Sequence, residues 1–118
     1  MKRALAAVAL IAIAGTCEAK PGPSAQNGHA VFDKWCAPCH APVAKLAGTL
    51  ALQTKYKGAL PAALEQRTDL TPDVVGYFVR NGVAWMAPFR KTEVSDAELA
   101  DLGAYLSKAP APKKAKTK

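Results

Sequence analysis

A pentapeptide in the first half of the chain, Cys36-Ala37-Pro38-Cys39-His40, constrains this sequence more than any other stretch. Two cysteines three residues apart, followed directly by a histidine, form the C-x-x-C-H pattern of c-type haem attachment. Each thiol can form a thioether with one of the two vinyl groups on one edge of a haem, and the histidine then lies under the iron. The motif therefore predicts one covalent haem c, held by Cys36 and Cys39, with His40 as an axial iron ligand.

Two other interpretations of the same cysteines need residues elsewhere in the chain. A structural zinc site needs further Cys or His ligands, and outside the motif the chain contains only Cys17 and His29. A dithiol/disulfide protein of the thioredoxin type would place the motif among β-strands, and the sequence shows no strand signal. Haem attachment is favoured, and a non-haem dithiol protein stays open as the less favoured alternative.

The first 19 residues have the composition of an export signal. Basic residues precede an apolar run over 5–14, and small residues lead to a predicted cleavage after Ala19. The apolar run is too short to span a bilayer, and a lipoprotein anchored at Cys17 is the weaker alternative. Because covalent haem attachment in bacteria happens outside the cytoplasm, we expect a periplasmic protein with the signal peptide 1–19 and no transmembrane segment.

The positive charge is concentrated at the C-terminus. The whole chain has a net charge of +7. Residues 110–118 contribute four lysines, whereas residues 20–109 carry a net charge of about +2. A nucleic-acid partner needs a basic patch on the folded domain, so that function loses its support. We expect a flexible linker over 20–26, one folded domain over 27–109 and a disordered Pro/Lys tail over 110–118, which at most contacts anionic surfaces weakly.

Helical periodicity predicts an all-α fold with three principal helices, one short helix and long loops. The principal helices are expected over 27–35, 71–80 and 95–108, and the short helix over 61–67. The three principal helices begin with N-cap residues at Asn27, Thr71 and Ser95, and Glu98 completes a capping box with Ser95. The local chemistry of these starts supports the assignment independently of the apolar pattern.

The helix expected over 71–80 also has a predicted buried face and a predicted end. Its apolar stripe consists of Val74, Val75, Phe78 and Val79. Asn81-Gly82 is predicted to stop it, since both residue types tolerate a positive φ.

Two features of the predicted loops and helices need a tertiary explanation. Gly28 lies on the apolar face of the first helix, where glycine costs roughly 1 kcal/mol relative to alanine, so we expect another element to approach it closely. The stretch 41–53 breaks its period at Pro42 and Gly48 and is predicted to be an irregular loop along the haem edge. The stretch 83–91 has no period either and is predicted to be a functional loop.

Elimination nominates the second iron ligand. The chain has two methionines, and Met1 is lost with the predicted signal peptide, which leaves Met86. His29 lies on the helix that leads into the motif and is poorly placed to reach the opposite face of a haem. Met86 is therefore the predicted sixth ligand, in a loop stiffened by Pro88. The alternative is a core methionine packed beside aromatic residues.

Taken together, these residues resemble a class I cytochrome c over about 27–107. The helix before the motif, the methionine loop and the closing helix occur in the family's order, and Gly28, Phe32 and Tyr105 match its helix-packing positions. The stretch RNGVAWMAPF (80–89) is similar to the R-N-G-x-x-x-M-P-x-F stretch of small bacterial cytochromes that serve dehydrogenases. These include the cytochrome subunits of p-cresol methylhydroxylase-type flavoenzymes.

Two departures from the family pattern stand out. Ala87 separates Met86 from Pro88, where the family commonly has proline directly after the methionine. Gly48-Thr49 replaces the family's Gly-Pro, whose proline carbonyl accepts a hydrogen bond from the ligand histidine. We expect the Thr49 carbonyl to accept that bond from His40 instead.

The resemblance implies an electron carrier that is not an enzyme. It would pass single electrons from a dehydrogenase to another cytochrome or an oxidase, and no acid/base pair or nucleophile is evident. The alternative is a haem-based ligand sensor or peroxidase-like protein, in which Met86 leaves the iron. Several side chains are possible contacts for the haem propionates, with Arg67 and Trp85 preferred: Tyr56, Lys57, Arg67, Trp85 and Arg90.

Overall fold

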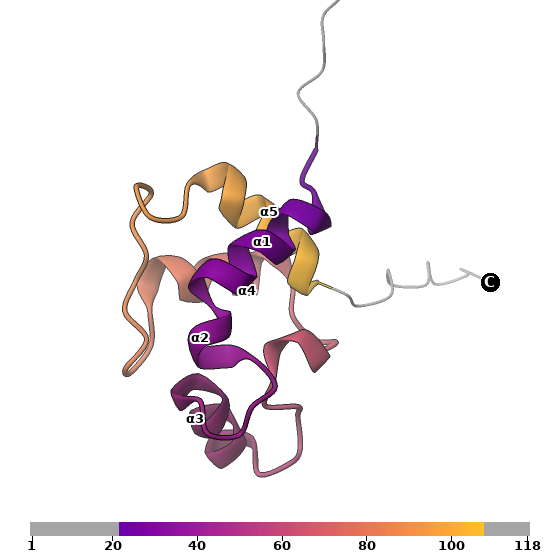
Figure 1. The fold of residues 1–118 in the computed structure, drawn as a ribbon, viewed down its shortest axis with the longest axis vertical. Coiled ribbons are helices and arrows are strands. Elements are labelled where there is room, and N and C mark those ends of the chain that lie inside the picture. The colour runs from indigo at the N-terminus through magenta and orange to yellow at the C-terminus, as the bar shows by residue number, and fades with distance from the viewer. Residues whose placement is uncertain (1–21, 108–118) are drawn as a thin grey trace, which may run out of the picture.

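The structure, a computed structural model, describes residues 22–107 as a set of helices joined by loops (Figure 1). In chain order the elements are α1 (Ala25–Trp35), α2 (Ala37–His40), α3 (Ala47–Tyr56), the 3-10 turn η1 (Leu64–Gln66), α4 (Pro72–Asn81) and α5 (Asp96–Leu106). Within residues 22–107 the extended pairing is limited to an isolated bridge between Val83 and Met86. The all-α class predicted from the sequence is confirmed.

Helices α1 and α5 cross in close contact at a glycine. A Cβ atom added to Gly28 would lie 2.0 Å from the carbonyl oxygen of Asp101 and 2.7 Å from the Cβ of Tyr105. Beside the crossing, the ring centroids of Phe32 and Tyr105 are 5.7 Å apart. The expected close approach to Gly28 is confirmed, and α5 is the element that makes it.

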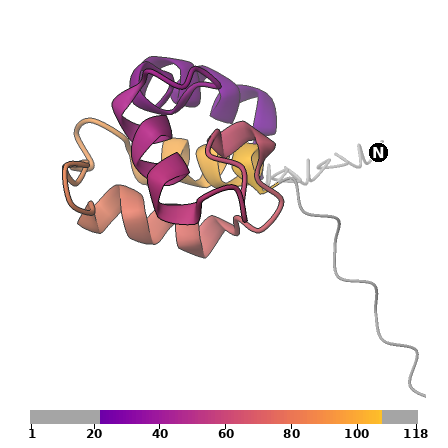
Figure 2. The same ribbon diagram turned by 90° about the horizontal axis from the view of Figure 1, so that it is seen from below.

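Helix α5 lies between α1 and α4 (Figure 2), so it forms the centre of the core. The side chains of Phe32, Leu102 and Val94 are buried almost completely, each with 1% exposure. The rest of this apolar cluster comes from the same helices and from the chain before α4: Val31, Leu70, Val75, Val79 and Leu106. Burial of these side chains is the main stabilising contribution to the domain.

The apolar stripe predicted for α4 is only partly buried. Val75 and Val79 belong to the core, whereas Val74 and Phe78 keep 38% and 36% of their surface exposed. Helix α4 therefore packs on α5 through a narrower face than the sequence pattern suggests. Its predicted start is confirmed, because the Thr71 side chain accepts a hydrogen bond from the amide of Val74.

The start predicted for the first helix at Asn27 is wrong. Helix α1 begins at Ala25, and Ser24 is its N-cap, with its hydroxyl oxygen 3.3 Å from the amide nitrogen of Asn27. The Ser24 amide also donates to a carboxylate oxygen of Asp101 at 2.6 Å, which ties this end to α5. The predicted linker 20–26 is thus helical in its last two residues, while the signal peptide and tail lie outside the described residues.

Helix α3 replaces most of the irregular loop predicted over 41–53. Its apolar residues do not repeat on one face, and Leu50 remains 51% exposed, so periodicity could not reveal this helix. Gly48 falls in its first turn, where glycine is tolerated. The short helix predicted over 61–67 is only the three-residue turn η1. Among residues 22–107 no helix is long and apolar enough to cross a membrane.

Candidate functional site

The C-x-x-C-H motif forms a short helical turn directly after α1. Cys36 ends α1 and begins α2, and the amides of Cys39 and His40 both donate to its carbonyl oxygen, at 3.0 and 2.8 Å. Both thiols are free. A single turn therefore carries two thiols and an imidazole, which is the donor set that covalent haem attachment requires.

The imidazole of His40 packs against the backbone of α3. A Cβ atom at Gly48 would lie 2.5 Å from Cε1 and 2.7 Å from Nδ1 of His40, so only glycine allows this contact. Burial lowers the pKa of His40 below its usual 6.5, because desolvation disfavours the charged imidazolium. The ring is therefore neutral at pH 7, which is the form that binds metal ions.

The hydrogen bond expected between His40 and the Thr49 carbonyl is not formed. Thr49 lies in the first turn of α3, where its carbonyl group points along the helix axis. Its buried hydroxyl instead donates to the carbonyl oxygen of Ala41 at 2.8 Å and fixes the chain that leaves the motif. Thr49 thus positions the loop after His40 rather than the imidazole itself.

The electrostatic environment of Cys36 does not suit thiol exchange. Burial, and to a lesser degree the charge of the neighbouring Cys39 thiolate, raises the pKa of Cys36 to about 11. Thiols that exchange disulfides have lowered pKa values, because the thiolate is the nucleophile. This difference counts against the dithiol alternative.

Within residues 22–107 no group of three or more His, Cys, Asp or Glu side chains is arranged to bind a metal ion.

Two buried polar atoms flank the cysteines without a hydrogen-bond partner. They are Nε1 of Trp35, directly before Cys36, and Nδ1 of His40, directly after Cys39. Buried polar groups in folded proteins almost always have partners. Nδ1 of His40 faces the backbone of α3 at Gly48, which leaves the other ring nitrogen, Nε2, for a metal ion. The free Nε2, the two thiols and the unpartnered indole nitrogen of Trp35 together fit a bound group at this place. Haem c suits these residues.

Met86 lies at the end of a tight turn in the methionine loop, residues 82–89, which leads from α4 towards α5. Val83 and Met86 exchange two backbone hydrogen bonds, each 2.9 Å long. Gly82 precedes the turn with φ of 67° and ψ of −179°, a conformation available essentially to glycine alone. A Cβ atom there would lie 2.3 Å from the Met86 carbonyl oxygen. The predicted helix stop at Gly82 is confirmed, and the same glycine shapes the methionine turn.

An aromatic contact links the methionine loop to the haem motif. Phe89 follows Met86 by three residues, and Trp35 directly precedes Cys36. Their rings meet edge to face, with centroids 5.8 Å apart. The structure thereby joins two segments that are about 50 residues apart in sequence.

The two residues preferred as propionate contacts have very different surroundings. Trp85, in the turn beside Met86, is 99% exposed. Arg67 is buried, forms an ion pair with Asp69 and has its guanidinium 4.7 Å from the ring centre of Tyr56. Asp69 itself is exposed, and the hydrogen bonds from Arg67 to its carboxylate are the main cause of the raised pKa of Arg67. A propionate contact for either residue remains a prediction.

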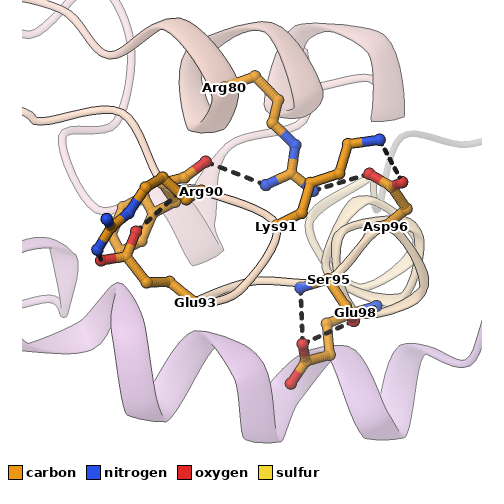
Figure 3. A network of polar contacts seen from close by, with 8 residues as sticks. Arg80, Arg90, Lys91, Glu93, Ser95, Asp96 and Glu98 are labelled. Atoms are coloured by element: carbon orange, nitrogen blue, oxygen red, sulfur yellow. Dashed lines mark hydrogen bonds and ion pairs between the residues drawn. The ribbon is translucent and has the colours of Figure 1, made fainter.

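Sequence reasoning missed the side chains that fix the methionine loop. Arg80, in the last turn of α4, donates to the carbonyl oxygen of Phe89 and to the carboxylate of Asp96 (Figure 3). A basic residue in a last helical turn is common, since it complements the helix dipole. In the sequence, Arg80 is distinguished only as the first residue of the stretch RNGVAWMAPF. This stretch gives no indication that Arg80 pairs with Asp96, which lies outside it.

An all-α domain that carries C-x-x-C-H at the end of its first helix belongs to the class of c-type cytochromes. The model of the family described as cytochrome c oxidase, cbb3-type, subunit III matches residues 23–106, and the chain belongs to this family. Searches of curated proteins and of solved structures give no match. The predicted resemblance to class I cytochromes c is confirmed.

Membership in this family sets the broad function. The protein binds haem and transfers electrons, and it exchanges those electrons with redox partners.

Proposed function

We propose that this protein is a periplasmic electron carrier with one covalent haem c. Cys36 and Cys39 hold the haem by thioether bonds, and His40 and Met86 are its axial iron ligands. The bound haem supplies an iron that alternates between the ferric and ferrous states. The carrier accepts one electron at a time from a dehydrogenase and passes it to another cytochrome or an oxidase.

The observation that carries this proposal is the single turn of α2. It brings two free thiols next to an imidazole that burial keeps neutral and that Gly48 holds in place. The role of this chain is to orient the ring of His40 and to keep water away from it. An imidazole fixed before the iron binds loses little conformational freedom on ligation, which favours a stable bond.

Ligation by Met86 distinguishes a carrier from a sensor or a peroxidase-like protein. A thioether ligand opposite His40 raises the reduction potential relative to two nitrogen ligands. With both axial positions filled, small molecules do not readily reach the iron. The tight turn at Val83 and Met86 and the anchored Phe89 support a loop that keeps its methionine in one place.

The location and the partners follow from chemistry and from the family. Residues 1–19 have the pattern of an export signal, and covalent haem attachment in bacteria takes place outside the cytoplasm. The family description refers to a subunit of an oxidase, in agreement with an oxidase as one electron acceptor. The similarity of residues 80–89 to cytochromes that serve flavoenzymes favours a dehydrogenase as the donor.

Intact mass spectrometry tests the covalent attachment. The protein is produced in a host that matures c-type cytochromes and is compared with the Cys36→Ser/Cys39→Ser double variant. We expect the mature protein to be heavier than its polypeptide by one haem, and the variant to have the polypeptide mass. A mature wild-type protein with the bare polypeptide mass would instead support the dithiol alternative.

Optical spectroscopy tests the methionine ligand. Ferric haem with a methionine ligand has a weak charge-transfer band in the far red, and a ferrous haem with both axial positions filled binds CO slowly. We expect the band in the oxidised protein and slow CO binding in the reduced protein. Absence of the band together with rapid CO binding would favour the sensor or peroxidase-like protein.

A further inference from the structure

The methionine loop is fastened most firmly at Phe89, where it leaves the turn. The Phe89 amide donates to the carbonyl oxygen of Val79 at 2.8 Å. The Phe89 carbonyl accepts a hydrogen bond of 3.1 Å from Nη1 of Arg80. Both polar groups of this peptide residue are therefore held by the last turns of α4. The ring of Phe89 is held separately, by Trp35.

The second nitrogen of the same guanidinium reaches the next helix. Nη2 of Arg80 donates to Oδ1 of Asp96, the first residue of α5, at 3.0 Å. The other carboxylate oxygen, Oδ2, accepts from Nζ of Lys91 at 2.7 Å (Figure 3). The Arg80 side chain is 23% exposed and that of Asp96 64%, so the ion pair is open to solvent on the Asp96 side, whereas the bond from Arg80 to Phe89 is partly buried. Arg80 thus joins the end of α4, the end of the methionine loop and the start of α5.

This arrangement matters because the loop has little regular structure of its own. Between Gly82 and Phe89 its described backbone pairing is the turn formed by Val83 and Met86. A segment of this kind is fixed in space by its ends, and Phe89 lies only three residues after Met86. A charge-assisted hydrogen bond is roughly twice as strong as a neutral one. The bond from Arg80 to the Phe89 carbonyl therefore strongly restrains the short segment from Met86 to Phe89.

We propose that Arg80, bridged to Asp96, is a positioning residue that keeps the thioether of Met86 on the haem iron. This inference rests on the proposed methionine ligation. Arg80 acts through the carbonyl oxygen of Phe89 and does not touch the iron. Without the bridge, Phe89 keeps its bond to Val79 and its contact with Trp35, so the fold survives while the loop opens more often.

The same connecting segment offers a matched control. Arg90 is also an arginine in one ion pair, with its Nη2 3.2 Å from a carboxylate oxygen of Glu93. Its side chain is 80% exposed. Arg90 is also a candidate for a propionate contact, but such a contact lies at the haem edge and does not hold Met86 on the iron, so the rate of CO binding does not depend on it. Arg80→Gln and Arg90→Gln therefore remove the same charge and one ion pair each, from the same region of the molecule. Only Arg80→Gln also removes a hydrogen bond to the carbonyl oxygen of Phe89.

The test compares the holoproteins of wild type, Arg80→Gln, Arg90→Gln and Asp96→Asn. The first readout is the rate of CO binding to the reduced protein, since CO enters only when Met86 leaves the iron. Loss of two hydrogen bonds to charged groups predicts an increase of about tenfold or more for Arg80→Gln. We expect a smaller increase for Asp96→Asn, which spares the bond to Phe89, and no change for Arg90→Gln. The far-red band should weaken in the same order.

The second readout does not depend on the iron. Hydrogen exchange of the Phe89 amide should be faster in Arg80→Gln than in Arg90→Gln. Equal CO rates in these two variants would overturn the positioning role, as would unchanged exchange at Phe89. Should Arg80→Gln not fold, the same comparison between Asp96→Asn and Arg90→Gln decides the proposal.

The wild-type spectrum separates this inference from the proposed function. A wild-type protein without the far-red band and with rapid CO binding refutes the methionine ligation, and with it the positioning of Met86. A wild-type protein with the band, and an Arg80→Gln variant that behaves like Arg90→Gln, refutes the positioning role alone.

Discussion

The two predicted iron ligands are held in different ways. His40 lies in a helix, and its ring is wedged against Gly48 of a second helix, with distances that leave no room for a Cβ atom. Met86 lies in a loop, and its position depends on hydrogen bonds and an ion pair at the loop's ends. Steric packing fixes His40, whereas hydrogen bonds and an ion pair fix Met86.

This difference has a consequence for how each ligand can be lost. Packing between helices is cooperative with the fold, so the contact at His40 breaks only when that part of the domain unfolds. A loop tied by a few hydrogen bonds opens at lower free energy while the core remains intact. We therefore expect the histidine to be the permanent ligand and the methionine to be the one that responds to substitution and pH.

The largest effect is expected for Gly48→Ala. The added Cβ would lie 2.5 Å from Cε1 of His40 and 2.7 Å from the Cys39 carbonyl oxygen, so α3 must move away from α2. Overpacking of this kind costs about 1–3 kcal/mol, and we expect the upper part of that range. Urea unfolding of the holoprotein measures it.

Gly76→Ala is the matched control for Gly48→Ala. It lies in α4, and the nearest atom to its added Cβ is Leu99 Cδ2 at 4.0 Å. Alanine there should stabilise the protein by up to about 1 kcal/mol through helix propensity. Similar free energies of unfolding for the two variants would show that Gly48 does not wedge the imidazole.

The next effect is expected for Gly82→Ala, and it should be local. The residue has φ of 67° and ψ of −179°, and an added Cβ would lie 2.3 Å from the Met86 carbonyl oxygen. Strained backbone at such a position costs roughly 1–3 kcal/mol, which the loop can relieve by rearranging. We expect loss of the far-red band with helix content unchanged by circular dichroism. A variant that keeps the band and loses helix content would contradict the account in which Gly82 shapes the methionine loop while the helical core stays intact.

A smaller effect is expected on acidification, and it should concern the methionine loop. Hydrogen bonds from Lys91 and then from Arg80 hold the pKa of Asp96 below its usual 3.8. A carboxylate with a lowered pKa in the folded state stabilises the protein above its unfolded pKa, and this contribution is lost as the pH falls through the folded value. Wild type should therefore be more stable than Asp96→Asn at pH 7. The difference should begin to shrink below about pH 4 and should disappear only when the pH has fallen below the folded pKa of Asp96.

Denaturant unfolding of wild type and Asp96→Asn across this pH range measures the effect. Glu93→Gln should show a similar pH dependence of unfolding, because hydrogen bonds from Arg90 lower the pKa of Glu93 as well. It should leave the far-red band unchanged, since Glu93 pairs with Arg90 and not with Arg80. If the difference in unfolding free energy between wild type and Asp96→Asn stays constant down to about pH 3, the ionised carboxylate of Asp96 does not provide the stabilisation proposed for it.

The smallest effect is expected for Trp85→Ala. Trp85 is 99% exposed at the turn beside Met86, so its indole contributes almost nothing to the core. Surface substitutions of this kind change stability by less than about 0.5 kcal/mol. Thermal unfolding and the far-red band should both remain as in wild type. A larger loss of stability, or of the band, would support the predicted contact between Trp85 and a haem propionate.

The sequence was most informative where one or a few neighbouring residues carry a specific chemistry. The caps at Thr71 and Ser95 and the stop at Gly82 depend on local hydrogen bonds or on backbone conformation, and the structure confirms them. Gly28 was recognised because glycine is costly inside a helix. The pattern C-x-x-C-H is likewise complete in five residues.

What could not be predicted depends on contacts between distant segments or on a weak local pattern. Helix α3 has no continuous apolar face, so tertiary contacts such as Gly48 against His40 define it. The bridge from Arg80 to Asp96 joins residues 16 apart, and many other acidic residues were equally plausible partners. The hydrogen bond expected from His40 to the Thr49 carbonyl is absent, because Thr49 lies in α3, a helix that the sequence analysis did not predict.

The reduction potential of Met86→His, compared with that of wild type, tests the central claim most directly. If His40 and Met86 are the axial ligands of one haem, the substitution replaces a thioether by an imidazole nitrogen, and the potential should fall clearly. The far-red band should vanish at the same time, while circular dichroism shows the same helix content. An unchanged potential in a folded, haem-loaded Met86→His variant would show that Met86 is not an iron ligand.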